Sequence, residues 1–493
     1  MAAPLSCAPI IAIAFDAAEP TLVRRLMAAG EMPVLADLAA RGGWADVTSS
    51  ADVGSGSVWP TFASGTGVHE HAAHFVWRWD AARMRLARET GETVVPFWRD
   101  AARAGRRVFT LDVPYLPLVD TDACVEIIEW GSHDRRLGSM HTRPHALAAQ
   151  IAREPGPHPF EHDPPPPHDD PSPRDLAVAS AKARAGATLR GEFAARMLTE
   201  LTPDLSLVVF SEMHHSSHLL WQSVAPDDPL FADRRRADLD DQVLLDVFRC
   251  ADEAVGHILA AAPADARIAV FSLHGMRSAA GIPTVLPALL AHLGYATSPR
   301  PGRMSARDAG RMAFAAVKTH APQRLRTAWR RNASLPLLNA VAGPTAMRAY
   351  DWDRTRAFVL PHDQHGWVRV NLAGREARGI VPAAHYTAFC DELSAALLAA
   401  RSGDGRPLVA RLVRIAEGSG GAPPACLPDL VVHWADAAYA DPVTVAGTGI
   451  VLRPDARRLT GRHSFDGFVI ADGLALPGPN VAGHDLHRML GAT

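Results

Sequence analysis

The sequence predicts an α/β fold: a doubly wound, mostly parallel sheet flanked by helices, with inserted cap segments. Three observations favour this fold class. Several short apolar runs are continuous rather than alternating, which is typical of strands buried on both faces of a parallel sheet. Stretches with helical periodicity separate these runs, and polar side chains follow the runs directly. In such sheets the functional site lies at the carboxyl ends of the strands.

Three strand-like runs each end beside polar side chains. They are Ile10–Phe15 before Asp16, Leu205–Phe210 before Ser211, and Ile268–Phe271 before Ser272 and His274. Helices are expected between these strands over Thr21–Ala29 and Leu239–Ala261. Further strand-like runs at Trp367–Asn371 and Leu430–His433 predict that the chain after position 355 closes the same core.

The expected core therefore comprises residues 1–290 and 355–493, with an insertion at about 75–175. Residues 154–174 are rich in Pro, Asp and His and are expected to form an irregular surface loop. Residues 291–354 are expected to be a basic inserted cap segment. Within it, Arg300–Arg331 carries nine basic residues and one acid, so it is either a lid over an anionic substrate or a solvated helical face.

Composition excludes several classes of protein. Among the 493 residues 48% are apolar and 21% are charged, so neither a disordered chain nor a coiled coil is expected. The net charge of −3 predicts no nucleic-acid duplex as partner. No apolar run reaches the roughly 18 residues of a membrane helix, so no membrane partner is expected.

The N-terminus and the cysteines indicate a cytoplasmic protein. Met1–Pro9 lacks the basic residues of a signal peptide. The five cysteines are widely spaced with no CxxC pair, which argues against disulfides and against a cysteine zinc site. The 23 histidines instead direct the search for a metal site toward imidazole ligands.

A candidate hydroxyl lies in the small, flexible stretch that begins at Gly54. A helix can start near Ser57, so Ser55 would lie beside free backbone N–H groups in the positive field of a helix N-terminus. Such a place lowers the cost of an alkoxide and suits a phosphate. Ser and Gly before a helix are also typical of an ordinary N-cap, and the spacing alone leaves both interpretations open.

Four histidines are candidate metal ligands. His214 and His218 are four residues apart, so on a helical turn they share one face and can provide half of a zinc site. His274 follows another strand, and His463 lies in a turn-like segment near the C-terminus. Taken singly, each is equally typical of a structural histidine with ordinary hydrogen bonds.

The order of these segments resembles the alkaline phosphatase superfamily, and most closely its type I phosphodiesterase/nucleotide pyrophosphatase branch. Asp16 resembles the first metal-binding Asp of the family. Ser55, nine residues before a Ser64-Gly65 pair that matches the family's Thr-Gly, falls at the position of the nucleophile. The other matching segments are Phe210–Trp221, Ser272–Met276 and Gly461–Gly467, which resemble segments that supply metal ligands, and Asn371–Gly379, which resembles a later, structural signature.

The resemblance implies two metal ions, with zinc favoured and manganese or iron as alternatives. One ion would be bound by His214, His218 and His463, and the other by Asp16, Ser55 and His274. Ser55 would attack phosphorus and form a phosphoserine, so the implied activity is hydrolysis of a small-molecule phosphoester of phosphodiester or nucleotide type.

Two further residues are expected to contact the substrate. Trp59 matches the branch's pattern around the nucleophile, and His133 lies in Glu129–Asp134, a stretch that resembles one recurrent in the bacterial branch. For the second stretch, a loop packed under the insertion is an equally good interpretation.

Two residues depart from the family pattern. His214 stands where many relatives have Asp, which changes the charge more than the capacity to bind metal. Leu273 stands where the family has a metal-binding Asp, and leucine cannot bind a metal. The alternatives are therefore a one-metal or altered-chemistry enzyme, such as a phosphomonoesterase or phosphonate hydrolase, or a non-catalytic metal-binding relative. A carboxylate within ligand reach of Asp16 and His274 would favour an enzyme, and apolar side chains there would favour a non-catalytic relative.

Overall fold

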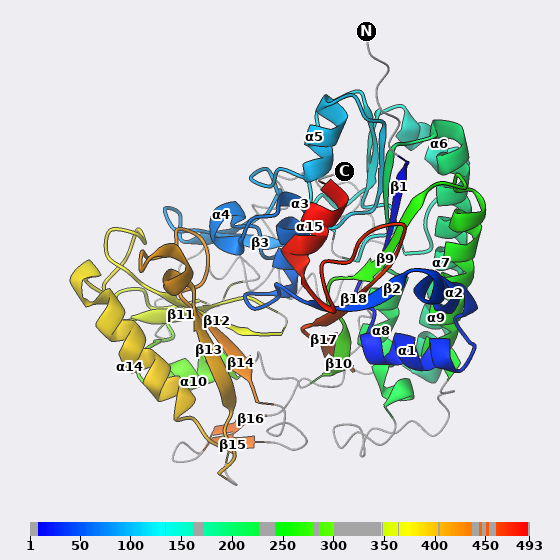
Figure 1. The fold of residues 1–493 in the computed structure, drawn as a ribbon. Coiled ribbons are helices and arrows are strands. Elements are labelled where there is room, and N and C mark those ends of the chain that lie inside the picture. The colour runs from blue at the N-terminus through cyan, green and yellow to red at the C-terminus, as the bar shows by residue number, and fades with distance from the viewer. Residues whose placement is uncertain are drawn as a thin grey trace.

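The computed structural model contains two lobes, each built around its own sheet (Figure 1). It describes residues 8–133, 135–160, 172–225, 242–279, 285–299, 347, 349–362, 364–402, 405–435, 443–445, 450–452 and 460–491. The larger lobe holds a nine-stranded sheet, and the smaller lobe holds a four-stranded sheet.

The nine-stranded sheet has the order β19-β2-β18-β9-β1-β8-β5-β6-β7. Its strands are β1 Ile10–Phe15, β2 Gly43–Thr48, β5 Val108–Leu111, β6 Cys124–Ile128, β7 His141–Arg143, β8 Leu205–Phe210, β9 Arg267–Ser272, β18 Asp466–Asp472 and β19 Asn480–Ala482. Strands β8, β1 and β9 are parallel neighbours at its centre, whereas β18 and β7 run antiparallel to the strands beside them. The prediction of a mostly parallel sheet is confirmed.

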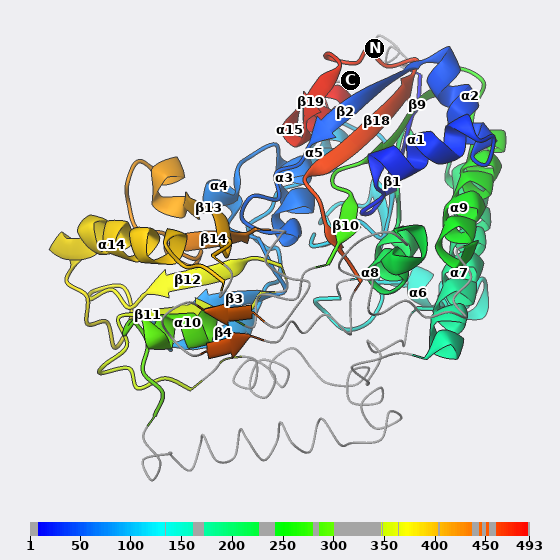
Figure 2. The same cartoon turned by 90° about the horizontal axis from the view of Figure 1, so that it is seen from below.

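Helices cover both faces of this sheet (Figure 2). One face carries α1 Pro20–Ala28, α2 Pro33–Arg41, α6 Leu147–Arg153, α7 Pro173–Leu201, α8 Glu212–Val224 and α9 Gln242–Ala260, and the other carries α3 Val58–Ser64, α5 Phe97–Arg103 and α15 Gly483–Gly491. In β1, Ile11, Ile13 and Phe15 pack in the first core, whereas Ile10, Ala12 and Ala14 pack in the second. The run is continuously apolar because successive strand side chains point to opposite faces and both faces are buried.

The longest described helix, α7, starts at a well-defined cap. The Ser172 hydroxyl accepts the backbone N–H of Asp175, the Asp175 carboxylate accepts the N–H of Ser172, and Pro173 occupies the first turn. This start falls inside the segment expected to be a loop, whose residues 161–171 lie outside the described part of the chain.

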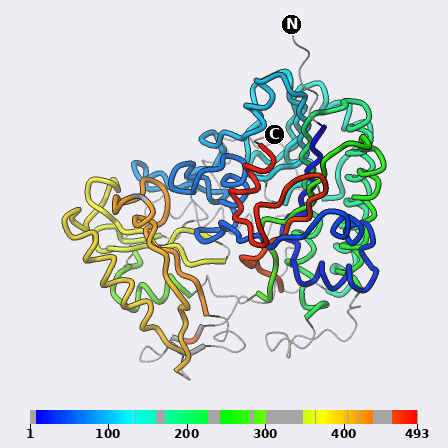
Figure 3. The backbone as a smooth tube through the Cα atoms, in the orientation of Figure 1, coloured from blue at the N-terminus to red at the C-terminus, as the bar shows by residue number. Residues whose placement is uncertain are grey.

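The smaller lobe corrects the predicted domain boundaries. Its antiparallel sheet consists of β11 Ala357–Leu360, β12 Gly366–Val370, β14 Leu430–Trp434 and β13 Val409–Arg414, in that order, with α10 Leu286–His292 and α14 Tyr386–Leu398 packed in the same core. The runs at Trp367–Asn371 and Leu430–His433 thus form strands, but they do not close the larger core. Of the described residues after position 355, those from Thr460 onward return to the larger lobe, as the tube shows (Figure 3). The basic stretch Arg300–Arg331 lies outside the described residues.

The predicted insertion at 75–175 is also revised. Strands β5, β6 and β7 lie within it, yet they form one side of the main sheet. Only the hairpin of β3 Trp77–Asp80 and β4 Arg85–Arg88 pairs outside that sheet. Whether a strand belongs to the main sheet depends on its pairing with segments far away in the chain, and local composition does not reveal that pairing.

The Asn371–Gly379 signature has the structural role expected of it. The Asn371 amide donates to the carbonyls of Trp352, Thr355 and Arg378. Glu376 is buried and accepts hydrogen bonds from the Arg369 guanidinium and from the Trp79 indole of the β3–β4 hairpin. The signature therefore ties this hairpin to the sheet of the smaller lobe.

The remaining described elements are short. They are helix α4 Val68–His71, the paired strands β10 Met276–Ser278 and β17 Gly461–His463, the paired strands β15 Val443–Val445 and β16 Ile450–Leu452, and the 3₁₀ helices Ser55–Ser57, Ala383–His385 and Ile415–Ser419. None of the described helices combines the length and the apolar character that crossing a bilayer requires.

Candidate active site

The candidate site lies at the carboxyl ends of the three central strands. Asp16 follows β1, His214 lies in the first turn of α8 after β8, and His274 follows β9. Because these strands are adjacent and parallel, the polar residues that follow them meet at one edge of the sheet. His463 joins them from β17, where it pairs with Met276 two residues after His274.

His214 is at the centre of the contacts among these residues. Its Nδ1 lies 2.6 Å from an Asp16 carboxylate oxygen, and its Nε2 lies 3.0 Å from His218 Nε2 and 2.7 Å from His463 Nε2. His274 Nε2 lies 3.4 Å from the other Asp16 oxygen. The structure thus brings together all four histidines and the aspartate predicted from the sequence.

The nitrogens of these imidazoles fit a metal ion. A neutral imidazole carries one N–H, and both His214 and His218 use Nδ1–H as donor, to the Asp16 carboxylate and to the Gly461 carbonyl at 2.8 Å. Their two Nε2 atoms therefore face each other with lone pairs 3.0 Å apart, an arrangement that a shared cation would stabilise. Among the described residues, the buried Nδ1 of His463 has no hydrogen-bond partner.

The protonation states suit metal binding. Burial, reinforced by the neighbouring imidazoles, lowers the pKa of His218 and of His463 well below the usual value. Both rings are thus neutral at pH 7, as ligands must be. For Asp16, burial alone would raise the pKa, but the positive field and hydrogen bonds of His214 and His274 outweigh it and hold the pKa well below the usual value.

Ser55 shares a small buried cavity with the ligand candidates. The cavity, of about 10 Å³, is lined by Asp16, Ser55, Trp59, Pro114, Tyr115, His214 and His274. Ser55 opens a 3₁₀ turn, Ser55–Ser57, that leads into α3. A Cβ on Gly56 would lie 2.4 Å from the His74 carbonyl oxygen, so this close approach requires glycine. Ser57 is fully buried and donates its hydroxyl to Gly54, which leaves Ser55 as the serine of this turn that faces the cavity.

Trp59 makes a different contact from the one expected. Its indole N–H donates to Asp16 at 3.0 Å, and its ring packs against Phe62 and Phe271. The side chain is 2% exposed. Trp59 lines the cavity, but its one polar group, the indole N–H, already donates to Asp16. Trp59 therefore positions Asp16 and has no donor left for a substrate.

His133 lies directly against the histidine cluster. Its ring stacks on that of His214 with centroids 4.1 Å apart, and the candidate ligand atoms of His133, His214 and His218 all lie within 4.8 Å of one another. His133 thus lies beside the candidate ligands, and its expected contact with substrate stays a prediction. Asp134 lies outside the described residues.

Leu273 has no carboxylate substitute in the described structure. Its side chain is 2% exposed and belongs to the apolar core that contains Trp59, Phe271 and Val469. Of the residues that line the cavity, only Asp16 carries a carboxylate. The apolar surroundings of Leu273 are the observation that, by the expectation from the sequence, counts against an enzyme and for a non-catalytic relative.

The sequence reasoning missed a buried charge network beneath the site. Arg190 of α7 is fully buried and contacts Asp112 at 2.7 Å and Glu212 at 3.0 Å, and Glu212 also contacts His158 at 2.9 Å. Glu212 is the first residue of α8, which carries His214 and His218. Asp112 directly follows β5, so the rule that polar residues follow strand ends could have identified it.

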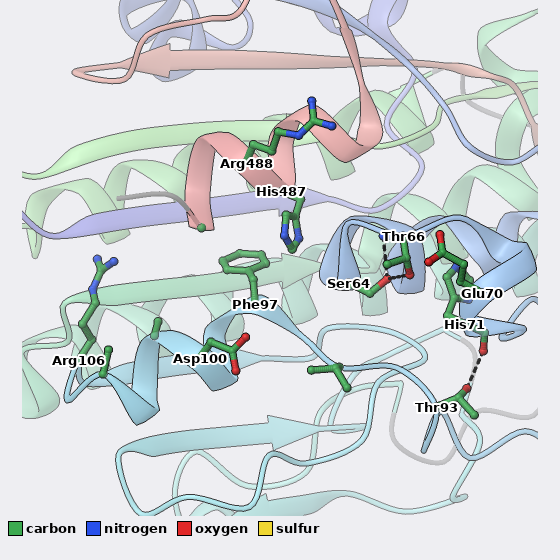
Figure 4. A pocket seen from close by; sticks show the side chains of 14 residues that line it. Ser64, Thr66, Glu70, His71, Thr93, Phe97, Asp100, Arg106, His487 and Arg488 are labelled. Atoms are coloured by element: carbon green, nitrogen blue, oxygen red, sulfur yellow. Dashed lines mark hydrogen bonds between the residues drawn. The ribbon is translucent and has the colours of Figure 1, made fainter.

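A second cleft, of about 820 Å³, lies between α3, α4, α5 and α15 (Figure 4). Phe97 and His487 face each other there, with ring centroids 5.1 Å apart. None of the predicted site residues lines this cleft, and its described lining offers no cluster of three potential metal ligands. We therefore place the chemistry in the smaller cavity, despite the greater size of this cleft.

Comparison with known proteins identifies the fold. No protein-family model and no curated protein sequence matches the chain. Phosphonoacetate hydrolase from Sinorhizobium meliloti 1021, solved with phosphonoformate, aligns over 98% of this chain and 95% of its own, with a TM-score of 0.53 and 13% identity. Its complex with phosphonoacetate gives the same values. The chain therefore shares the fold of this phosphonoacetate hydrolase.

Human ectonucleotide pyrophosphatase/phosphodiesterase 5 also aligns over 98% of this chain and 93% of its own, with a TM-score of 0.46 and 12% identity. In this chain, the smaller lobe lies in sequence between β10 and β17. That placement explains why His463 reaches the site so late in the sequence.

Proposed function

We propose that this protein is a metal-dependent hydrolase of phosphoesters in which Ser55 is the nucleophile. The observation that carries the proposal is the buried cavity that Ser55 shares with Asp16, His214 and His274. A metal ion held by the histidines would act as a Lewis acid, which a serine hydroxyl needs because it is a weak nucleophile at neutral pH.

The residues of the chain divide the remaining tasks. Ser55 Oγ would attack phosphorus and form a phosphoserine while the P–O bond to the ester oxygen breaks, and that oxygen would leave with the proton from the serine hydroxyl. Water would then cleave the Oγ–P bond, which restores the hydroxyl and releases the phosphate group. Asp16 accepts the Nδ1–H of His214 and so fixes the tautomer whose Nε2 lone pair faces His218 and His463. Trp59 holds the same carboxylate in place.

The charge of the site favours an anionic substrate. Asp16 is the one carboxylate among the residues that line the cavity, so a divalent cation bound beside it would leave the site with net positive charge. A phosphodiester or nucleotide-type substrate follows from the resemblance of the sequence. A phosphonate belongs in the same test, because the structural neighbour is a phosphonoacetate hydrolase.

A second candidate is an enzyme that uses one metal ion, or a metal-binding relative without turnover. The burial of Leu273 in the apolar core supports it, since the position that would carry the second carboxylate has none. Zinc suits the imidazole ligands in either case, with manganese or iron as alternatives.

The deciding experiment combines metal content per chain with turnover of an aryl phosphodiester, an aryl phosphomonoester and phosphonoacetate. Ser55→Ala should abolish turnover and retain metal, whereas the matched control Ser57→Ala should keep turnover within a few-fold of wild type. Two equivalents of metal with Ser55-dependent turnover would support the two-metal hydrolase, and one equivalent with such turnover the one-metal enzyme. Bound metal without turnover of any of these compounds would overturn the hydrolase proposal.

A further inference from the structure

We infer that His133 is a metal ligand, which gives the site an additional imidazole in place of the carboxylate that Leu273 lacks. This inference rests on the proposed metal dependence of the protein. It goes beyond the ligand set expected from the sequence, in which His133 contacts substrate.

The first support is geometric. The candidate ligand atoms of His133, His214 and His218 lie within 4.8 Å of one another. Imidazole nitrogens bound to one zinc ion lie roughly 3–4 Å apart, because each Zn–N bond is about 2.0–2.1 Å. The ring centroid of His133 is 4.1 Å from that of His214 and 5.2 Å from that of His218. Because His133 stacks on His214 at an interplanar angle of 25°, a rotation of its ring is what would direct a nitrogen lone pair at the shared ion.

The second support is the way in which the backbone around His133 is held. The Asp112 carboxylate accepts the backbone N–H groups of Trp130 and Gly131 at 2.8 and 2.6 Å. After His133, the Glu129 carboxylate accepts the N–H groups of Arg136, Leu137 and Gly138. The segment is thus fixed on both sides of the histidine, as a preorganised ligand requires.

The third support is that this segment and the other ligands are held by the same network. Arg190 contacts two carboxylates, those of Asp112 and Glu212. Asp112 holds the backbone of the segment that carries His133. Glu212 is the first residue of α8, the helix that carries His214 and His218. A Cβ on Gly131 would lie 2.3 Å from Arg190 Nη2, so the loop packs directly on this guanidinium. The network therefore sets the distance between His133 and the α8 histidines.

An extra imidazole has a chemical consequence. A site rich in nitrogen ligands with one carboxylate prefers zinc, cobalt, nickel or copper over magnesium or manganese, which favour oxygen ligands. The site would therefore retain Zn²⁺ or Co²⁺ in the presence of a large excess of Mg²⁺.

The test uses Co²⁺ and Zn²⁺ with the full-length apoprotein. His133→Phe keeps a stacking ring but removes the nitrogens, so it separates ligation from packing; His133→Ala opens a space that free imidazole can enter. His145→Ala, an exposed histidine of the same region, is the matched control. Affinity is measured by competition with a chromogenic chelator, and coordination by the visible absorption of bound Co²⁺.

We expect His133→Phe and His133→Ala to lower the affinity at least about tenfold and to change the Co²⁺ spectrum, with His145→Ala unchanged. Added imidazole should restore the spectrum of His133→Ala only. If wild type binds metal and His133→Phe matches it in affinity and spectrum, His133 is a packing residue and the inference is overturned, while the proposed function stands. If wild type binds neither metal, the proposed metal dependence fails as well.

Discussion

Replacing Arg190 with methionine is expected to destabilise the larger lobe by about 3–5 kcal/mol, because it would leave two buried carboxylates without their cation. The guanidinium and both partners are fully buried, with contacts of 2.7 Å to Asp112 and 3.0 Å to Glu212. Methionine conserves much of the side-chain volume, so the expected loss is mainly electrostatic. Urea unfolding is followed by near-UV circular dichroism. Trp130, whose ring centroid lies 5.6 Å from the guanidinium carbon of Arg190, is one of the tryptophans that contribute to this signal.

Arg196→Met is the matched control on the same helix. Arg196 pairs with Glu154 at 2.9 Å, but its side chain is 36% exposed and that of Glu154 is 81% exposed, so the expected loss is only about 0–1 kcal/mol. Equal losses for the two variants would refute the assignment of Arg190 as the centre of a buried network. Metal affinity should also fall in Arg190→Met, because Arg190 holds the segments of His133 and His214.

The loss in Arg190→Met should depend on pH with a defined sign. Burial alone would raise the pKa of Glu212, but the charge of Arg190 and the hydrogen bond from His158 hold it below the usual value. A lowered carboxyl pKa contributes stability above the unfolded-state pKa, and this stability is lost as pH falls through the folded-state pKa. Without Arg190, Glu212 can be protonated at higher pH, so the difference from wild type should be largest near pH 7 and shrink toward pH 4.

Three further predictions concern the site and the core. Trp59→Phe removes the indole N–H that donates to the Asp16 carboxylate and should lower metal affinity about tenfold, as measured by competition with a chelator. An unchanged affinity would contradict the role of Trp59 in positioning Asp16. Zn²⁺ at 100 times its Kd should stabilise wild type by about 2.7 kcal/mol in urea unfolding, and should leave His218→Ala unaffected. Burial lowers the pKa of His71 and His74 to about 4, so between pH 6.5 and pH 4 the unfolded state binds more protons than the folded state. The free energy of unfolding of the apoprotein should therefore fall as the pH is lowered from 6.5 to 4. A free energy of unfolding that does not change over this range would contradict the burial.

The central part of the fold was predictable because its signals are local. The runs at Ile10–Phe15 and Leu205–Phe210 became β1 and β8 with the expected bounds, and both are apolar along their whole length because both faces of the sheet are covered. The helices Thr21–Ala29 and Leu239–Ala261 were placed to within three residues of α1 and of the described bounds of α9. The fold class, confirmed by the sheet order, followed from this alternation.

The apolar runs and helical periodicity did not predict which of the two lobes each strand belongs to. A strand such as β12 looks alike in sequence whether it pairs with the larger sheet or forms a sheet of its own. The pairing partner of each strand is set by contacts between segments far apart in the chain, and no local pattern encodes it. For the same reason β5 and β6 were assigned to an insertion, although they pair with each other and β5 pairs with β8 in the main sheet.

The sequence by itself determined the set of chemical groups at the site: a strand-end aspartate, a serine in a glycine-rich turn, histidines in three segments, and an apolar leucine at position 273. These are properties of residue type and order. Only the tertiary structure decided that Trp59 contacts Asp16, that His133 stacks on His214, and that Arg190 lies beneath both ligand segments. Such contacts depend on side-chain direction and on the packing of distant elements, which exist only once the chain has folded.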